Sequence, residues 1–522
     1  MGEWMTRPGF LPLIFGLSLL LAACASVRQD PSLAPGAALA KPEETALWHA
    51  LVPPEEAARG HSGFFFLEGG LDAYETRLLA IESAARTIDL QYYIWDFDGS
   101  GRAISEALFR AAERGVHVRA LVDGYLVDND SEPLKQIVNH PNIDVRIYNA
   151  FRTSFWPRYL RYGELLIDFP RLNQRMHNKI IAVDNTVAIV GGRNVNDTYF
   201  ALDGDHYFLD LDVVIAGPLT KDVSASFDAF WNSPYAVPVE HFVEDETIPF
   251  SFATVWNEIF AYDMEAFPLP RRLEVMELAE KYIALEKRFV WAPASLVLTA
   301  PGPVFQDIAV PPGQQIETAM LSHIASAERE VLIQNPYVMM TEPRAAVLAD
   351  AQARGVRTIL QTNSLASHDS ALVHYGFVRD RKKFMGNGVA LYELKPRPDN
   401  SRNMPGIGLT PEKTTLHSKT IVFDRRYVLV GSFNLDPRSI DYNSEIGILI
   451  ESPKLASRVA GAIEVDLAPE NSWRVVGDGE GGIVWLDETE TPPLRLDTEP
   501  ETSFVERIPV WLGYVLPIDH LL

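Results

Sequence analysis

The chain has 522 residues, of which 47% are hydrophobic and 22% charged, as expected of a folded protein with about two domains. Its formal net charge of −24 disfavours nonspecific binding to nucleic acid, which depends on Lys and Arg. The same charge provides no overall attraction to an anionic membrane, so membrane contact would require a separate anchor.

The N-terminus has the features of a bacterial lipoprotein leader. Arg7 precedes an uncharged run, residues 10–23, whose length suits a signal peptide and is short for a membrane span. The run ends in Leu-Ala-Ala before Cys24, the sole cysteine, so residues 1–23 are expected to be removed and Cys24 lipidated. A secretory signal with an incidental cysteine is the alternative. Ala25, rather than Asp, points to the periplasmic face of the outer membrane in the bacterial cell envelope.

Strand-like and helix-like segments alternate along the rest of the chain, which favours an α/β fold. Ile104, Leu108 and Ala111 keep helical spacing before Gly115, which is a stop signal, and residues 179–183 suit a buried strand. The expected order is a tether (24–45), a first domain (46–240), a helical connector (241–288), a second domain (289–465) and a C-terminal tail (466–522). The apolar end of the tail could lie on a membrane or pack against the second domain.

One polar pattern occurs twice, with identical internal spacing. The first copy comprises His177, Lys179, Asp184, Gly191, Gly192 and Asn194. The second comprises His417, Lys419, Asp424, Gly431, Ser432 and Asn434. A histidine, a cation and a neutral donor at fixed spacing suit a phosphate group, and two copies suggest two half-sites that face one substrate.

These paired HxKxxxxD motifs, each followed by a Gly-Gly/Ser-x-Asn turn, resemble the phospholipase D superfamily over nearly the whole mature chain. Further segments resemble its bacterial cardiolipin synthase C branch: 171–176, 191–194, 362–366, 391–396 and the tail around 502–504. The resemblance implies two duplicated phospholipase D-like domains, each a mixed β-sheet flanked by helices. It also implies a pseudo-twofold relation between the domains and one shared active-site cleft.

The resemblance also implies roles for the residues of the two motifs. His177 would attack phosphorus and form a phosphohistidine, and His417 would serve as general acid and base. The lysines and asparagines would bind the phosphate, supported by Gly192 and Ser432. Glu445 matches the acid that orients His417, and Asp210, with Asp212 as competitor, matches the acid that orients His177. Asp184 and Asp424 are expected to be structural, and no metal or cofactor is expected.

The implied reaction is transfer of a phosphatidyl group to phosphatidylglycerol, with phosphatidylethanolamine as donor, to form cardiolipin. The expected partners are these phospholipids and a membrane surface. Whether an accessory protein takes part is left open, and no nucleic acid is expected. The rivals are a hydrolytic phospholipase D that releases phosphatidic acid, a nuclease of the same superfamily, and a noncatalytic envelope lipoprotein that binds lipid.

Two features lie outside the motifs. Residues 151–162 mix aromatic residues with arginines, which suits either a membrane interface or a flap over the active site. His374 lies near a basic run and is expected on a solvated helix face.

Overall fold

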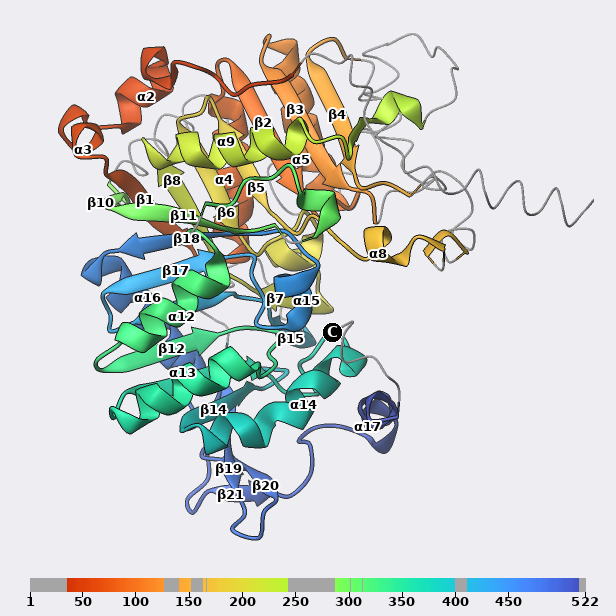
Figure 1. Ribbon diagram of the computed structural model, residues 1–522, viewed down its shortest axis with the longest axis vertical. Coiled ribbons are helices and arrows are strands. Elements are labelled where there is room, and N and C mark those ends of the chain that lie inside the picture. Colours follow the sequence, from red (N-terminus) through yellow and green to blue (C-terminus); the bar gives the residue numbers. More distant parts are fainter. Residues whose placement is uncertain are drawn as a thin grey trace, which may run out of the picture.

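The computed structural model describes residues 35–125, 140–151, 163–165, 167–242, 287–300, 302–311, 313–399 and 411–515. The expected leader with Cys24, and nearly all of the expected connector 241–288, lie outside these ranges. The two halves of the chain stack against each other, each around its own large sheet (Figure 1). This architecture confirms the predicted α/β class with a duplicated domain.

The first half is built on a nine-stranded mixed sheet. In spatial order its strands are β10 (Val290–Ala292), β1 (Ser62–Leu67), β8 (Asp212–Ala216), β6 (Val187–Gly191), β5 (Ile180–Val183), β2 (Thr87–Tyr92), β3 (His117–Asp123), β4 (Ile143–Tyr148) and β9 (Ala236–Pro238). Strands β2, β3 and β4 are parallel and the other pairs are antiparallel. Helices α4 (Gly70–Ser83) and α5 (Gly99–Glu113) pack with this sheet in one core cluster.

The second half repeats this plan in a ten-stranded sheet. Its order is β11 (Ala294–Thr299), β18 (Glu445–Glu451), β17 (Tyr427–Gly431), β16 (Thr420–Phe423), β12 (Glu330–Gln334), β13 (Arg357–Asn363), β14 (Val389–Leu394), β19 (Ser472–Gly477), β20 (Ile483–Asp487) and β21 (Leu494–Leu496). Its core includes α12 (Ile316–Ser326), α13 (Glu342–Ala353) and α14 (Ala371–Gly386). Strands β12, β13 and β14 are parallel, as their counterparts are in the first half.

Shorter elements complete the described chain. They are η1 (Pro42–Glu44), α2 (Ala46–Leu51), α3 (Pro54–Ala58), α8 (Phe169–Leu172), η2 (Asp197–Phe200), β7 (His206–Leu209), η3 (Val239–His241), η6 (Pro303–Phe305), β15 (Lys413–Leu416) and α15 (Pro437–Asp441). The expected helix ahead of Gly115 is α5. It begins where the Asp98 side chain accepts a hydrogen bond from Gly101 N, and it is followed by Gly115 at φ +90°.

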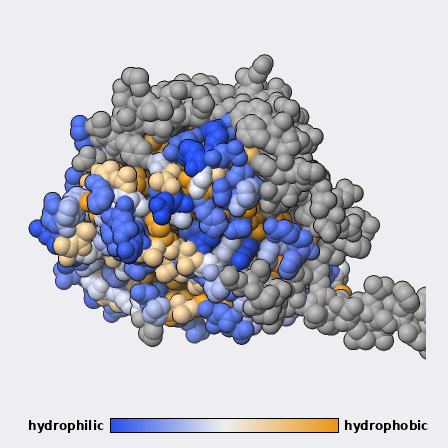
Figure 2. All heavy atoms as spheres, turned by 90° about the horizontal axis from the view of Figure 1, so that it is seen from above, coloured by the Kyte–Doolittle hydropathy of each residue, from blue (hydrophilic) through white to orange (hydrophobic). Residues whose placement is uncertain are grey.

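A shared apolar core joins the two sheets. It contains Phe64 and Val213 from the first sheet, Ile448 from the second, and residues of α9 (Leu219–Trp231) and α16 (Pro453–Asp466). The chain passes from one sheet to the other within a few residues, because β10 belongs to the first sheet and β11 to the second. The first sheet therefore includes a strand from beyond residue 289, where the second domain was expected to begin. Polar residues cover much of the described surface seen from above, and hydrophobic patches lie between them (Figure 2).

The two halves also exchange backbone hydrogen bonds at their seam. Strand β7 of the first half pairs in parallel with β15 of the second, and Leu209 lies opposite Leu416. A second parallel bridge joins Met176 to Ser444. These four residues immediately precede Asp210, His417, His177 and Glu445 respectively, so the crossings fix the positions of the key polar side chains.

The ends of the described chain are held against the domains. Within the expected tether, Gly36 N donates to Asn232 Oδ1 at 2.9 Å and Ala38 N donates to Asp228 Oδ2 at 2.7 Å. The expected tail supplies β19, β20 and β21 to the second sheet and ends in α17 (Phe504–Gly513), which packs against α14. Among the described helices, none combines the length and apolar character needed to cross a bilayer.

Candidate active site

The two motif histidines meet at the seam between the halves. Both line one cavity of about 480 Å³, together with Asn194 and Asn434. Each backbone is fixed by the opposite half: His177 N donates to Ser444 O at 3.0 Å, and His417 N donates to Leu209 O at 2.8 Å. The structure therefore brings the two distant motifs together around one space.

Each histidine has a buried carboxylate against its Nδ1. His177 Nδ1 lies 2.9 Å from Glu445 Oε2, and His417 Nδ1 lies 2.6 Å from Asp210 Oδ2. Ser439 Oγ donates to Glu445 Oε1 at 2.9 Å, and Leu211 N donates to Asp210 Oδ1 at 2.7 Å. A carboxylate on Nδ1 holds the proton there and leaves Nε2 for chemistry in the cavity.

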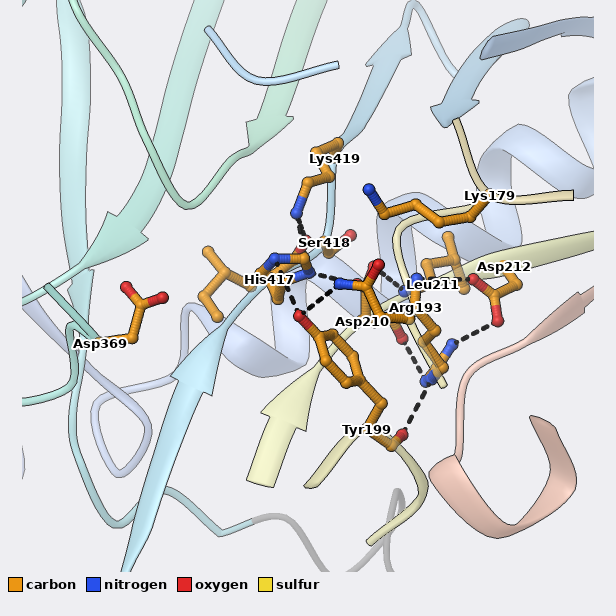
Figure 3. A network of polar contacts seen from close by, with 12 residues as sticks. Lys179, Arg193, Tyr199, Asp210, Leu211, Asp212, Asp369, His417, Ser418 and Lys419 are labelled. Atoms are coloured by element: carbon orange, nitrogen blue, oxygen red, sulfur yellow. Dashed lines mark hydrogen bonds and ion pairs between the residues drawn. The ribbon is translucent and has the colours of Figure 1, made fainter. Parts of the chain in front are cut away.

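The pairing is crossed, contrary to our expectation that each acid orients the histidine of its own half. The parallel bridges explain the exchange, because the residue before each histidine pairs with the residue before the other half's acid. Asp212, the competing candidate, forms ion pairs with Arg77 at 2.8 Å and Arg193 at 3.3 Å. Asp212 therefore holds buried arginines and is not the partner of a histidine (Figure 3).

Both motif lysines are buried beside the histidines. Lys179 Nζ donates to His177 O at 2.7 Å, and Lys419 Nζ lies 2.8 Å from His417 Nδ1. The two side chains enter the same region from opposite halves (Figure 3). Burial lowers the pKa of Lys179 to about 7 and that of Lys419 to about 8, although Glu445 and Asp210 oppose the change. An anionic phosphodiester in this cavity would raise both values by charge attraction.

The histidines are also held toward the neutral form. Burial, followed by the charges of Lys179 and Lys419, lowers the pKa of His177 well below its ordinary value. Burial and Lys419 lower the pKa of His417 to about 4 against the attraction of Asp210. Burial raises the pKa of Glu445 to about 8, whereas the charges of Lys419 and His417 outweigh burial and lower that of Asp210. The two histidine–acid pairs are thus electrostatically unequal.

The two motifs differ at one position, where the first has Gly192 and the second has Ser432. This difference fits the unequal electrostatics of the two histidine–acid pairs. A Cβ atom on Gly192 would lie 2.5 Å from both carboxylate oxygens of Asp210, so only glycine leaves room for that acid. At the matching position Ser432 Oγ donates to Glu445 Oε2 at 2.5 Å. Gly192 thus supports His417 through Asp210, and Ser432 supports His177 through Glu445.

The motif asparagines flank the cavity. Asn194 Nδ2 donates to Tyr199 Oη at 3.0 Å, and its Oδ1 accepts from Ile94 N at 3.3 Å. Asn434 is 5% exposed, and its Oδ1 has no hydrogen-bond partner within the described parts of the chain. Both side chains are placed to contact a bound phosphate.

The motif aspartates lie away from the cavity. Asp184 accepts hydrogen bonds from the backbone N–H groups of residues 85, 86 and 87, at 2.8–2.9 Å. Asp424 accepts from residues 328, 329 and 330 at 2.8–3.0 Å. Each aspartate therefore ties the start of a parallel strand, β2 or β12, to the hairpin that follows the motif.

The cavity also contains residues that the sequence analysis did not assign. They are Tyr93, Ile94, Asp96, Asn196, Thr198, Tyr199, Phe208, Tyr337, Asp369, Val373, Asp436, Arg438 and Asn443. Tyr93 and Tyr337 follow the corresponding strands β2 and β12 of the two halves, so a comparison of the two halves of the sequence could have identified them. His374 is 1% exposed and lies 3.2 Å from an Arg381 nitrogen, so the expectation of a solvated position was wrong. Cys24 and residues 152–162 lie outside the described residues.

Comparison with known proteins gives a consistent result. A family model described as "Cardiolipin synthase, PLD-like domain" matches residues 78–231 and 320–467. The chain is 34% identical over 478 residues to cardiolipin synthase C of Escherichia coli (strain K12), which covers 91% of this chain and 99% of that protein. It is 25% identical to cardiolipin synthase 1 of Staphylococcus aureus (strain COL), over 77% of this chain and 66% of that protein. Phosphatidylserine synthase of Haemophilus influenzae Rd KW20 shares the fold with a TM-score of 0.50 at 15% identity, over 90% of this chain and 99% of that structure.

Proposed function

We propose that this chain makes cardiolipin. The premise is that it belongs to the cardiolipin synthase family of the phospholipase D superfamily and is a phosphatidyltransferase. The proposed donor is phosphatidylethanolamine, and the proposed acceptor is a glycerol hydroxyl of phosphatidylglycerol. The observation that carries the proposal is the single cavity lined by His177 and His417, each with a buried carboxylate on Nδ1.

In the first proposed step, Nε2 of His177 attacks the phosphorus of the donor. In its ionised form Glu445 supports the attack by keeping the proton of the ring on Nδ1. The bond from phosphorus to the headgroup oxygen breaks, and His417 donates a proton from Nε2 to that oxygen. For this step His417 must be doubly protonated, and the anionic phosphodiester favours that form by raising the pKa of the ring. The products of this step are a phosphohistidine at His177 and free ethanolamine. The buried lysines offset the negative charge that would otherwise repel the nucleophile.

In the second proposed step, neutral His417 takes the proton of the acceptor hydroxyl. The acceptor oxygen attacks phosphorus and displaces His177, which regenerates the enzyme. Capture by water in place of the acceptor would give phosphatidic acid, so transfer requires that the acceptor lipid be positioned over the phosphohistidine. Hydrolysis is the rival outcome that the experiment must separate.

The proposed substrates lie in a bilayer, and we place the protein at a membrane surface. Two features support this placement. The leader ending at Cys24 fits a lipid anchor at the periplasmic face of the outer membrane. In addition, α17 exposes large apolar side chains, including Val505 at 70% and Trp511 at 49%. Aromatic and aliphatic residues on one helix suit the interfacial region of a bilayer.

The direct test uses purified protein in vesicles of phosphatidylethanolamine and phosphatidylglycerol, with lipid products identified by mass spectrometry. We expect cardiolipin and ethanolamine in equal amounts, and neither product from His177→Ala. A trapped phosphoryl group should map to His177. Phosphatidic acid without cardiolipin would establish a hydrolase, and a phosphoryl group mapped to His417 would reverse the two roles.

A further inference from the structure

The wall of the cavity around His417 differs in chemistry from the phosphate-binding centre. Asp369 lines the cavity there, together with the rings of Tyr199, Phe208 and Tyr337. The centroids of these three rings lie 5.1, 5.2 and 6.4 Å from that of the His417 ring. An acid and three aromatic rings thus lie on the His417 side of the cavity.

Asp369 is an anion that remains accessible from the cavity. Its side chain is 27% exposed, and Tyr337 Oη donates to its Oδ2 at 2.5 Å. Burial raises its pKa, but the contacts with His368 and Tyr337 and the charge of His417 outweigh burial and hold the pKa well below its ordinary value. Within the described residues it forms no direct ion pair with a lysine or arginine. His368 Nδ1 lies 3.2 Å away, and Lys413 and Lys419 interact with its charge at longer range. This carboxylate can therefore accept a further cation.

In-line displacement places the leaving headgroup on this wall. The nucleophile and the leaving oxygen lie on opposite sides of phosphorus, and the leaving oxygen must reach the general acid. With His177 as nucleophile, the headgroup projects toward His417. In Figure 3, His417 lies between Lys179 and Asp369, so Asp369 is on the far side of His417 from the lysine of the first motif.

We propose that Asp369, with Tyr199, Phe208 and Tyr337, forms a subsite for the ammonium group of the donor headgroup. The carboxylate pairs with the cation, and the ring faces add cation–π attraction. An uncharged glycerol headgroup would gain neither interaction. The subsite rests on the proposed function. It would select the phospholipid with an amino alcohol headgroup as donor and leave phosphatidylglycerol as acceptor.

The test compares two donors that differ in headgroup charge: phosphatidylethanolamine and its N-acetyl derivative, in which the amine is neutral. The measurement is kcat/KM for headgroup release, which reports donor use whether the acceptor is lipid or water. For Asp369→Asn we expect a loss of roughly 10- to 100-fold with phosphatidylethanolamine and a change of less than about twofold with the N-acetyl donor. Asp369→Glu, which keeps the charge, should retain the preference for the amine.

Two further variants complete the design. Phe208→Leu removes a ring and should reduce the preference several-fold, which provides a second arm if Asp369→Asn does not fold. Asp350→Asn, whose carboxylate is 61% exposed on α13, is the matched control and should behave as wild type. An equal loss with both donors in Asp369→Asn would overturn the subsite and assign Asp369 to positioning of His417. Headgroup release without cardiolipin would overturn the proposed transferase activity. The comparison of the two donors would still test the subsite.

Discussion

At the scale of single residues, the site depends on two carboxylates that differ by one methylene group. Asp210 is short, and Gly192 allows it to approach the opposite half. Glu445 is longer, and it accepts hydrogen bonds from Ser432 and Ser439. These two environments lower the pKa of Asp210 and raise that of Glu445. Separated pKa values are what a site needs if one histidine attacks while the other transfers protons.

Replacement of Asp210 should alter the pH dependence of the reaction. Burial lowers the pKa values of His417 and Lys419, and the charge of Asp210 opposes this effect at both groups. Asp210→Asn removes that opposition, so both pKa values should fall further. We expect kcat/KM to drop by about 100-fold or more and the alkaline limb of its pH profile to move to lower pH.

The profile is measured as headgroup release from vesicles at about pH 5–9, a range that includes the pKa of Lys419, about 8. Asp212→Asn is the contrasting variant, because Asp212 pairs with Arg77 and Arg193. It should lower the melting temperature while the alkaline limb stays in place. An unmoved limb in Asp210→Asn would contradict the assignment of Asp210 as the partner of His417.

Much of this site could be predicted from the sequence because its histidine, lysine and asparagine sets are duplicated. Repetition marks such residues without any knowledge of the fold. The crossed pairing of Asp210 and Glu445 could not be predicted in this way, because sequence spacing suggests partners within one half. Asp369 gave no signal either, since a single acid in an unassigned segment resembles any surface acid until strands and loops from both halves converge.

At the scale of elements, the motif aspartates connect each motif hairpin to the parallel strand beside it. Both adopt positive φ, +50° at Asp184 and +52° at Asp424, and each accepts three backbone hydrogen bonds. Asp184 is fully buried, whereas Asp424 is half-buried. The same motif position should therefore have unequal effects on stability in the two halves.

This difference can be measured with Asp184→Ala and Asp424→Ala. We expect a loss of about 3 kcal/mol in the free energy of unfolding for Asp184→Ala, since buried N–H groups lose a charged acceptor. Asp424→Ala should cost less, because water can replace the carboxylate at a half-buried site. Thermal or urea unfolding provides the values, and equal costs would show that burial does not set the strength of this connection. Neither change should shift the pH profile of activity.

The elements themselves were predictable to different extents. The helix before Gly115 and the strand after Lys179 were confirmed as α5 and β5, because local spacing determines both. The attachment of β10 to the first sheet and of β19, β20 and β21 to the second was not apparent. These strands are short or distant, and their membership depends on which sheet edge is open rather than on their own composition.

At the scale of the whole molecule, α17 lies next to the active-site cavity. Its buried residue Val510 shares a core cluster with Tyr375 and Met339, and Val373, which lines the cavity, packs against the same cluster. The opposite face of α17 is exposed and apolar. A membrane in contact with that face would meet the protein close to the cavity.

Vesicle binding tests this arrangement in a chain that lacks the lipid anchor and begins at residue 25. Val505→Ser with Trp511→Ser should weaken co-sedimentation with phosphatidylglycerol-containing vesicles by roughly tenfold or more, because less apolar surface enters the bilayer. Val465→Ser with Leu494→Ser is the matched control, since these exposed side chains lie elsewhere, on α16 and β21. Unchanged binding in the α17 variant would refute membrane contact through this helix.

The exchange of acids across the seam has a consequence for the order in which the enzyme is made. His177 leaves the ribosome long before Glu445, which stands 268 positions further along the chain. The first half alone lacks the acid that contacts its motif histidine, and so does the second half alone. We therefore expect a nascent or prematurely terminated polypeptide to be inactive, and activity to begin only after both halves have been synthesised and have docked.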